Sequence, residues 1–66
     1  MDTPLFPAGR AVGIRRRLLG IPLAELAREA GITPDLLRMV EDGKYDPHSL
    51  HALAARVIQK RLDVTL

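Results

Sequence analysis

Arginine is concentrated near the start of this chain, in residues 9–20, which contain no acidic residue: Arg10, Arg15, Arg16 and Arg17. Further cations follow at Arg38, Lys44, Arg56, Lys60 and Arg61. The formal net charge is only +2, so the distribution of charge says more than its total. A clustered basic face is what binding to phosphate groups requires. An ordinary solvated helix surface would show the same residues, and both interpretations stay open at this point.

Other chemistry has little support in the sequence. His48 and His51 are three residues apart and could share one side of a helix, but only Asp46 lies close by and the chain has no cysteine. A structural zinc site needs four ligands. No serine–histidine pair, phosphate-binding glycine loop or paired carboxylate suggests catalysis. We therefore expect no enzyme activity, no metal, no cofactor and no small-molecule ligand.

Length and composition favour one small helical domain. The chain has 66 residues, and a domain of this size buries only ~60% of its unfolded surface. Hydrophobic residues make up 47%, yet there is one Phe and one Tyr, so aliphatic residues form the core and packed helices are favoured over a sheet. Neither a secretory signal nor an apolar run of about 20 residues is present. We expect a cytoplasmic protein with no membrane contact.

The stretch from Leu23 to Val40 predicts two short helices joined by a tight turn. Its apolar residues follow helical spacing in two runs: Leu23, Leu26, Ala27 and Ala30, then Leu36, Leu37 and Val40. Gly31 can adopt the left-handed conformation that ends a helix. Thr33 can cap the next helix, and Pro34 suits its first position. Ala27 is small enough to let the second helix pass close to the first, and the whole pattern describes a helix-turn-helix.

This segment resembles the helix-turn-helix of the lambda-repressor-like, Cro-type family of small transcription regulators. The positions that carry the resemblance are Leu26, Ala27, Gly31, Ile32, Leu37 and Val40, followed by Glu41-Asp42-Gly43-Lys44, Pro47 and the apolar run from Leu50. It covers about residues 9–58. It implies an all-α bundle of four to five helices, with Arg16 paired to Glu41.

The predicted organisation has three parts. Residues 1–8 form an extended arm, residues 9–62 the helix-turn-helix domain, and residues 63–66 a tail that could include a short strand. We expect helices over 9–19, 22–30 and 34–42, with a loop from Lys44 to His48. A fourth helix, capped by His48 or Ser49, continues to about Leu62, because the glycine break that related domains usually have near position 58 is absent.

The resemblance implies a sequence-specific DNA-binding regulator, expected to act as a repressor, that places helix 34–42 in the major groove of double-stranded DNA. Arg38 could bind a phosphate or guanine, and Asp35 could accept from cytosine. Phosphate contacts from other cations would position the protein without specifying sequence. The expected DNA-binding residues are Arg10, Arg15, Arg17, Thr33, Pro34, Asp35, Leu36, Arg38, Met39, Lys44 and Tyr45.

The groove-facing surface departs from the family in being apolar. Leu23 replaces a common glutamine, and Leu36 and Met39 stand where hydrogen-bonding residues are usual. The alternative function is therefore a protein-interaction module that uses these three side chains. Homodimerisation is also expected, because twofold binding to half-sites is the usual use of the motif. Its expected contacts lie near the chain end, where a frayed terminus is the alternative: Val57, Ile58, Leu62, Val64 and Leu66.

Overall fold

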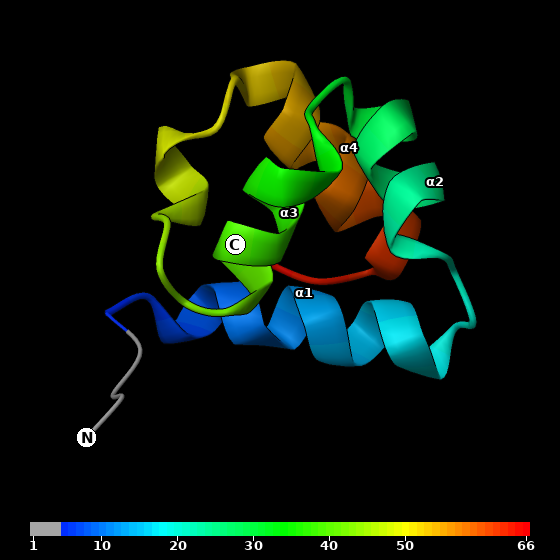
Figure 1. Ribbon diagram of the computed structural model, residues 1–66, viewed down its shortest axis with the longest axis horizontal. Helices are drawn as coiled ribbons and strands as arrows, with labels where there is room; N and C mark the ends of the chain where they lie inside the picture. The colour runs from blue at the N-terminus through cyan, green and yellow to red at the C-terminus, as the bar shows by residue number, and fades with distance from the viewer. Residues whose placement is uncertain (1–4) are drawn as a thin grey trace.

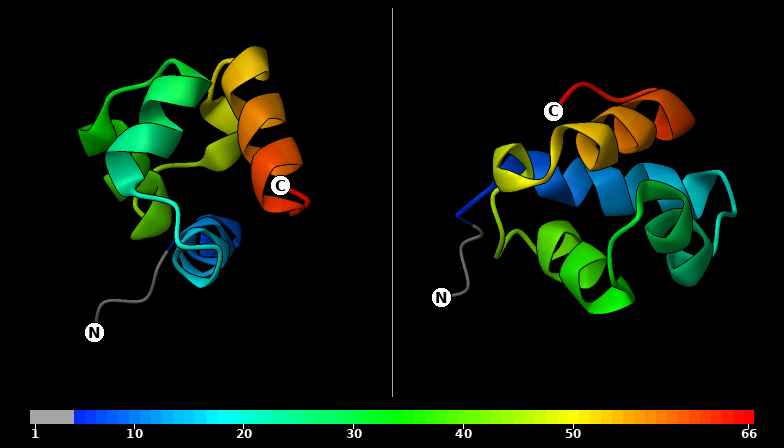
Figure 2. Two further views of the ribbon diagram at one scale, coloured as in Figure 1. Left: turned by 90° about the vertical axis from the view of Figure 1, so that its right-hand side faces the viewer. Right: turned by 90° about the horizontal axis from the view of Figure 1, so that it is seen from above.

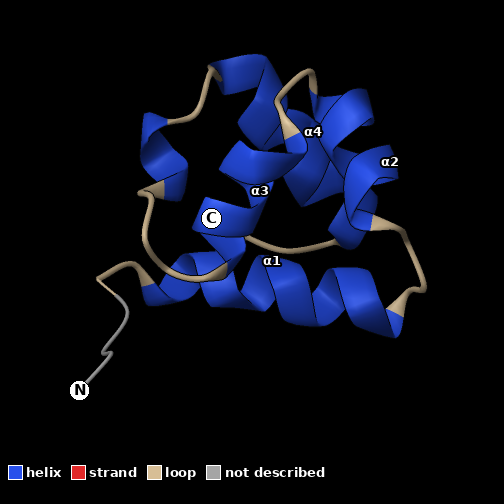
Figure 3. Ribbon diagram, in the orientation of Figure 1, coloured by secondary structure: helices blue, strands red, loops and turns tan. Residues whose placement is uncertain are grey.

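Four α-helices and one short 3-10 helix account for most of residues 5–66, the part of the chain that the computed structural model describes (Figure 1). Within these residues there is no strand (Figure 3). The all-α prediction is therefore confirmed, and the number of α-helices is the lower of the two expected. In chain order the elements are α1 (Pro7–Leu18), α2 (Leu23–Ala30), α3 (Pro34–Glu41), η1 (Pro47–Ser49) and α4 (Ala52–Leu62).

The helices pack in pairs around one core. α1 contacts α3 and α4, and α2 contacts the same two helices. Seen along its axis, α1 lies beneath all the others, so one of its sides has no neighbour (Figure 2). The same views place α3 and the C-terminal segment on opposite sides of the molecule. The outer surfaces of α1 and α3 are therefore both available to other molecules.

Aliphatic side chains fill the core, and within residues 5–66 no polar side chain is buried with them. Each large side chain buried in this way contributes about 1.5–3 kcal/mol relative to exposure. The stripes expected on α2 and α3 provide Leu26, Ala27, Leu37 and Val40. The full set is Val12, Ile21, Leu26, Ala27, Ala30, Leu37, Val40, Leu50, Ala54, Ile58 and Leu62.

The turn between α2 and α3 is built as its sequence predicts. Gly31 has φ 72° and ψ 28°, a left-handed conformation that suits glycine. Its N–H bonds the carbonyl of Arg28, and the N–H of Ile32 bonds the carbonyl of Ala27, which is a Schellman ending. The hydroxyl of Thr33 accepts from the N–H of Leu36 at 3.1 Å and so caps α3.

The start of α1 differs from the prediction. The helix begins at Pro7 rather than Gly9, because proline has its backbone angle preset and needs no N–H partner in the first turn. The N–H of Phe6 donates to the carbonyl of Gly43 at 3.2 Å, which joins this end of the chain to the turn after α3. Residues 7 and 8 of the predicted arm are therefore helical, and residues 1–4 of it lie outside the described residues.

The end of α4 agrees with the prediction, but its N-terminal cap does not. The cap is neither His48 nor Ser49, which belong to η1; His51 caps the helix by accepting from the N–H of Leu53 at 3.2 Å. The other end lies at Leu62, as expected. Residues 64–66 form no strand, and Val64 and Leu66 pack against the core.

Two glycines allow α1 to approach α3 closely. A Cβ atom on Gly9 would overlap the backbone carbonyl of Val40, and one on Gly13 would lie 3.0 Å from the Oε1 atom of Glu41. Backbone atoms cannot move aside as a side chain can. The contact at Gly9 therefore fixes how closely the two helices can pack.

Gly9→Ala should destabilise the protein even though alanine favours a helix by about 1 kcal/mol relative to glycine. The overlap with Val40 should outweigh that gain and lower the free energy of unfolding by about 1–3 kcal/mol. Urea denaturation followed by circular dichroism measures the change. Gly13→Ala is the comparison variant: it should also lose stability, because the added Cβ presses on the carboxylate of Glu41, but the loss should be smaller because a side chain can shift by a few tenths of an ångström. A Gly9→Ala variant more stable than the parent would contradict the close contact.

Candidate nucleic-acid interface

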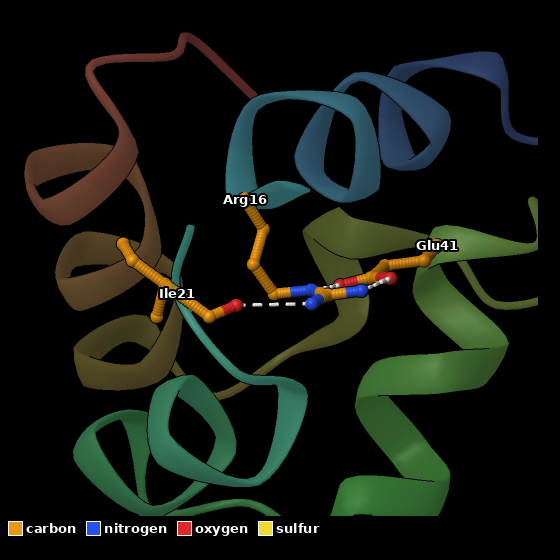
Figure 4. A network of polar contacts seen from close by, with 3 residues as sticks. All are labelled: Arg16, Ile21 and Glu41. Atoms are coloured by element: carbon orange, nitrogen blue, oxygen red, sulfur yellow. Dashed lines mark hydrogen bonds and ion pairs between the residues drawn. The ribbon is translucent and has the colours of Figure 1, made fainter. Parts of the chain in front are cut away.

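A bidentate ion pair holds α3 against α1 (Figure 4). Nε of Arg16 donates to Oε2 of Glu41 at 2.7 Å, and Nη2 donates to Oε1 at 3.0 Å. The third nitrogen, Nη1, donates to the carbonyl of Ile21 at 3.0 Å. One side chain of α1 therefore connects the segment that enters α2 to the last residue of α3.

The pair is mostly shielded from water, because the side chains of Arg16 and Glu41 are only 13% and 7% exposed. The hydrogen bonds that Arg16 donates to Glu41 raise the pKa of Arg16; desolvation opposes this shift and the carboxylate charge adds to it. Charge-assisted bidentate bonds are short and geometrically specific. The pair expected between these residues is present, and it sets the position of the helix whose outer face is the candidate site.

The outer face of α3 carries a mixture of charges. Asp35, Arg38, Met39 and Asp42 are exposed and follow the spacing of one helical face. Within residues 5–66, Arg38 forms no ion pair. This face can therefore offer one guanidinium, two carboxylates and a thioether, with Met39 44% exposed.

Other predicted groove residues are placed differently. Thr33 and Pro34 are exposed at the start of α3, beside its outer face. Leu36 is partly buried and packs against the core, as does Leu23. Only part of the Leu36 side chain is therefore available to contact bases, because the rest packs against the core between the helices.

The predicted phosphate contacts separate into two groups. Arg10 and Arg17 are seven residues apart and exposed, so they lie two turns apart on one flank of α1. Arg15 points to the other flank, where its Nε donates to the carbonyl of Leu62 at 3.1 Å. This bond caps the end of α4, and we therefore leave Arg15 out of the candidate interface. The contact joins residues 47 positions apart, so nothing in the local sequence could have indicated it.

The residues after α3 continue the interface. Lys44 is exposed and follows Gly43, whose φ of 75° turns the chain away from the helix. Tyr45 is half-buried against the core, and its hydroxyl donates to the carbonyl of Ser49 at 3.5 Å. Lys44 can therefore reach a phosphate, whereas Tyr45 has a structural role and only part of its ring is exposed.

The C-terminal segment folds back on its own domain. Ile58 and Leu62 are fully buried, so the expectation that they contact a second subunit is wrong for the folded domain. The N–H of Leu66 donates to Oε1 of Gln59 at 3.3 Å. Of the expected dimer contacts, Val57, Val64 and Leu66 keep part of their surface exposed.

The described residues show no group of three or more possible metal ligands. Among them His51 caps α4, and His48 is 3.4 Å from a carboxylate oxygen of Asp46. No helix over residues 5–66 has both the length and the apolar character needed to cross a bilayer. A hollow beside α4 is lined by Val57, Lys60 and Arg61.

Comparison with models of known families, with curated proteins and with solved structures gave no match. The resemblance to lambda-repressor-like regulators stays a prediction from the sequence. The function of the chain is therefore inferred from its own residues and their geometry.

Glu41→Ala should destabilise the protein strongly, because it leaves the shielded guanidinium of Arg16 without its partner. Removing one member of a fully buried pair costs about 3–5 kcal/mol, and the loss at this partly buried pair should be somewhat smaller but still a large part of the stability of a small domain. Thermal unfolding followed by circular dichroism measures the effect. An unchanged melting temperature would show that the pair does not hold α3.

Two variants sharpen this test. Glu29→Ala removes the exposed pair with Arg61, which has an N–O distance of 3.1 Å, and should cost less than about 1 kcal/mol. Replacing both members of the shielded pair, as Arg16→Met with Glu41→Leu, should recover much of the stability lost in Glu41→Ala. Equal losses at Glu29 and Glu41 would contradict the difference in burial.

Proposed function

We propose that this protein is a sequence-specific DNA-binding transcription regulator, acting as a repressor, that inserts α3 into the major groove. The observation that supports this most directly is the arrangement of α2, the Gly31 turn and α3. It leaves one side of α3 exposed while Arg16 and Glu41 brace the helix from behind. Because small regulators of the lambda-repressor-like type bind DNA in the cytoplasm, we propose a cytoplasmic location.

Base recognition is assigned to the outer face of α3. The guanidinium of Arg38 suits the two acceptors on the major-groove edge of guanine, and Asp35 can accept from the amino group of cytosine. Met39 offers an apolar contact to a thymine methyl group. Thr33, Pro34 and the exposed part of Leu36 lie next to the backbone and base edges in this arrangement.

The two carboxylates on the outer face of α3 would increase the sequence selectivity of this interface and lower its affinity for DNA. Asp35 and Asp42 share the outer face of α3 with Arg38, and both are repelled by phosphates. A carboxylate in the groove is tolerated where it meets an amino group and is costly elsewhere. Arg10, Arg17 and Lys44 supply the compensating attraction to the phosphate backbone, which positions the domain without reading bases.

The same acidic groups favour a second candidate, a protein-interaction module on the same fold. Its expected apolar surface is smaller than the sequence suggests, because Leu23 and Leu36 pack partly against the core and only Met39 is exposed. This candidate predicts no retention of duplex DNA at low salt, whereas the DNA-binding function requires it.

Homodimerisation stays a prediction with a geometric constraint. The segment after α4, which contains Val64 and Leu66, lies on the side of the molecule opposite α3 (Figure 2). A twofold contact confined to these residues would turn the two copies of α3 away from each other. Dimeric binding to adjacent half-sites therefore requires contacts beyond this set.

Selection of bound duplexes from a random pool tests the function directly. Recovery of one preferred sequence supports base recognition, and a palindrome would add twofold symmetry. Binding to a recovered duplex should weaken as salt rises. The logarithm of the association constant should fall linearly with the logarithm of the salt concentration, with a slope of about 0.9 for each phosphate contact. Failure to retain any duplex at low salt would overturn the proposal.

The double variant Arg38→Ala with Lys44→Ala should bind the selected duplex at least about tenfold more weakly, with a salt slope lower by about 1 for each lost phosphate contact. Fluorescence anisotropy at several salt concentrations measures both quantities. Arg56→Ala with Lys60→Ala is the matched control, because it removes the same charge from the exposed side of α4. Equal losses in the two variants would show a nonspecific effect of net charge and contradict the docking of α3.

A further inference from the structure

An apolar stripe runs along the outer side of α1, and the core does not account for it. Pro7, Ala11, Ile14 and Leu18 are all exposed, with Ile14 at 51% and Leu18 at 72%. Their spacing of four, three and four residues places them on one side of the helix. This spacing is that of the seam of a coiled coil, where each apolar residue inserts between residues of a facing helix.

The stripe has no partner within the described chain. The buried residues of α1 are Gly9, Val12 and Gly13, which face the other helices. The left view of Figure 2, which looks along α1, shows the other helices on one side of it. The stripe is therefore an available helix face rather than part of the core.

Cations border the stripe on both sides. Arg10 and Arg17 lie along one edge and Arg15 along the other, and α1 contains no acidic residue. The bond from Arg15 to the carbonyl of Leu62 neutralises none of its charge. These are the flanking positions whose charges select a partner in helix pairing.

We propose that this face of α1 binds an acidic amphipathic helix of a partner protein. The aliphatic side chains of that helix pack between Ile14 and Leu18, and its Glu or Asp residues pair with the flanking arginines. A second copy of α1 is a poor occupant, because its arginines would face those of the first copy. An anionic membrane is also a poor occupant, because the stripe has only two large aliphatic side chains and no aromatic residue.

The site is defined apart from the proposed DNA contacts. Ile14 and Leu18 belong only to the stripe, whereas Arg10 and Arg17 border it and also serve the candidate nucleic-acid interface. The test therefore changes the aliphatic residues and uses no DNA, so that its outcome does not depend on the proposed function.

The probe is a fluorescent synthetic helix of about three heptads with Leu at the seam positions and Glu at the flanking positions. A second peptide carries Lys at those flanking positions. Anisotropy with the full chain should show binding of the Glu peptide only. Ile14→Gln with Leu18→Gln should weaken that binding at least about tenfold while the circular dichroism spectrum stays unchanged. Leu53→Gln removes an aliphatic side chain that is 60% exposed on α4 and should leave binding unaltered.

Four outcomes would overturn the proposal. The first is failure of the Glu peptide to bind, and the second is equal binding of the Lys peptide. The third is unchanged affinity in the Ile14 and Leu18 variant. The fourth is self-association in sedimentation velocity, or adsorption to phosphatidylserine vesicles, that this variant abolishes and the Leu53 control keeps. Either behaviour would identify a second copy or a membrane as the occupant.

Discussion

The ion pair between Arg16 and Glu41 connects the parts of this small domain that matter for its function. It joins the last turn of α1 to the end of α3, and a third bond from the same guanidinium reaches Ile21 before α2. Gly9 and Gly13 let the two helices approach closely beside this pair, where a Cβ atom would meet Val40 or Glu41. Its shielding makes the geometry specific, since a displaced carboxylate would leave a charge without a partner in a poorly solvated place. The position of the candidate recognition helix therefore depends on an electrostatic contact as much as on aliphatic packing.

Features encoded by neighbouring residues could be predicted from the sequence. Gly31, Thr33 and Pro34 act through backbone preference and a short capping bond, which require no knowledge of distant residues. The role of Arg15 could not be predicted in this way, because its acceptor lies on another helix. Apolar spacing also shows that Ile58 and Leu62 are buried, but it cannot show whether their own core or a second subunit covers them. The resemblance supplied the pairing of Arg16 with Glu41, which residue spacing alone would not have established.

The outer face of α3 decides how the fold can be used. A single guanidinium between two carboxylates gives little general attraction to a polyanion, so the flank of α1 and Lys44 must supply it. In the proposed function, the cations on α1 and Lys44 would set the affinity for DNA, and the outer face of α3 would set the sequence preference. Under this proposal, cations outside the groove would bring the domain to any duplex, and Asp35 would then disfavour bases that offer it no donor. A recognition helix with only apolar residues on its outer face could not reject bases that lack a hydrogen-bond donor. A helix with only basic residues there would bind DNA of many sequences with similar affinity.

The two proposed surfaces share charged residues, and this has a thermodynamic consequence. Arg10 and Arg17 border the apolar stripe of α1 and also belong to the candidate nucleic-acid interface. An acidic helix that pairs with them withdraws two cations from the phosphate backbone and adds negative charge beside it. Under both proposals, binding of the partner helix would weaken DNA binding. DNA would weaken partner binding by the same factor, because the coupling free energy between two ligands is reciprocal. The coupling requires no change of conformation, since competition for the same guanidinium groups is sufficient.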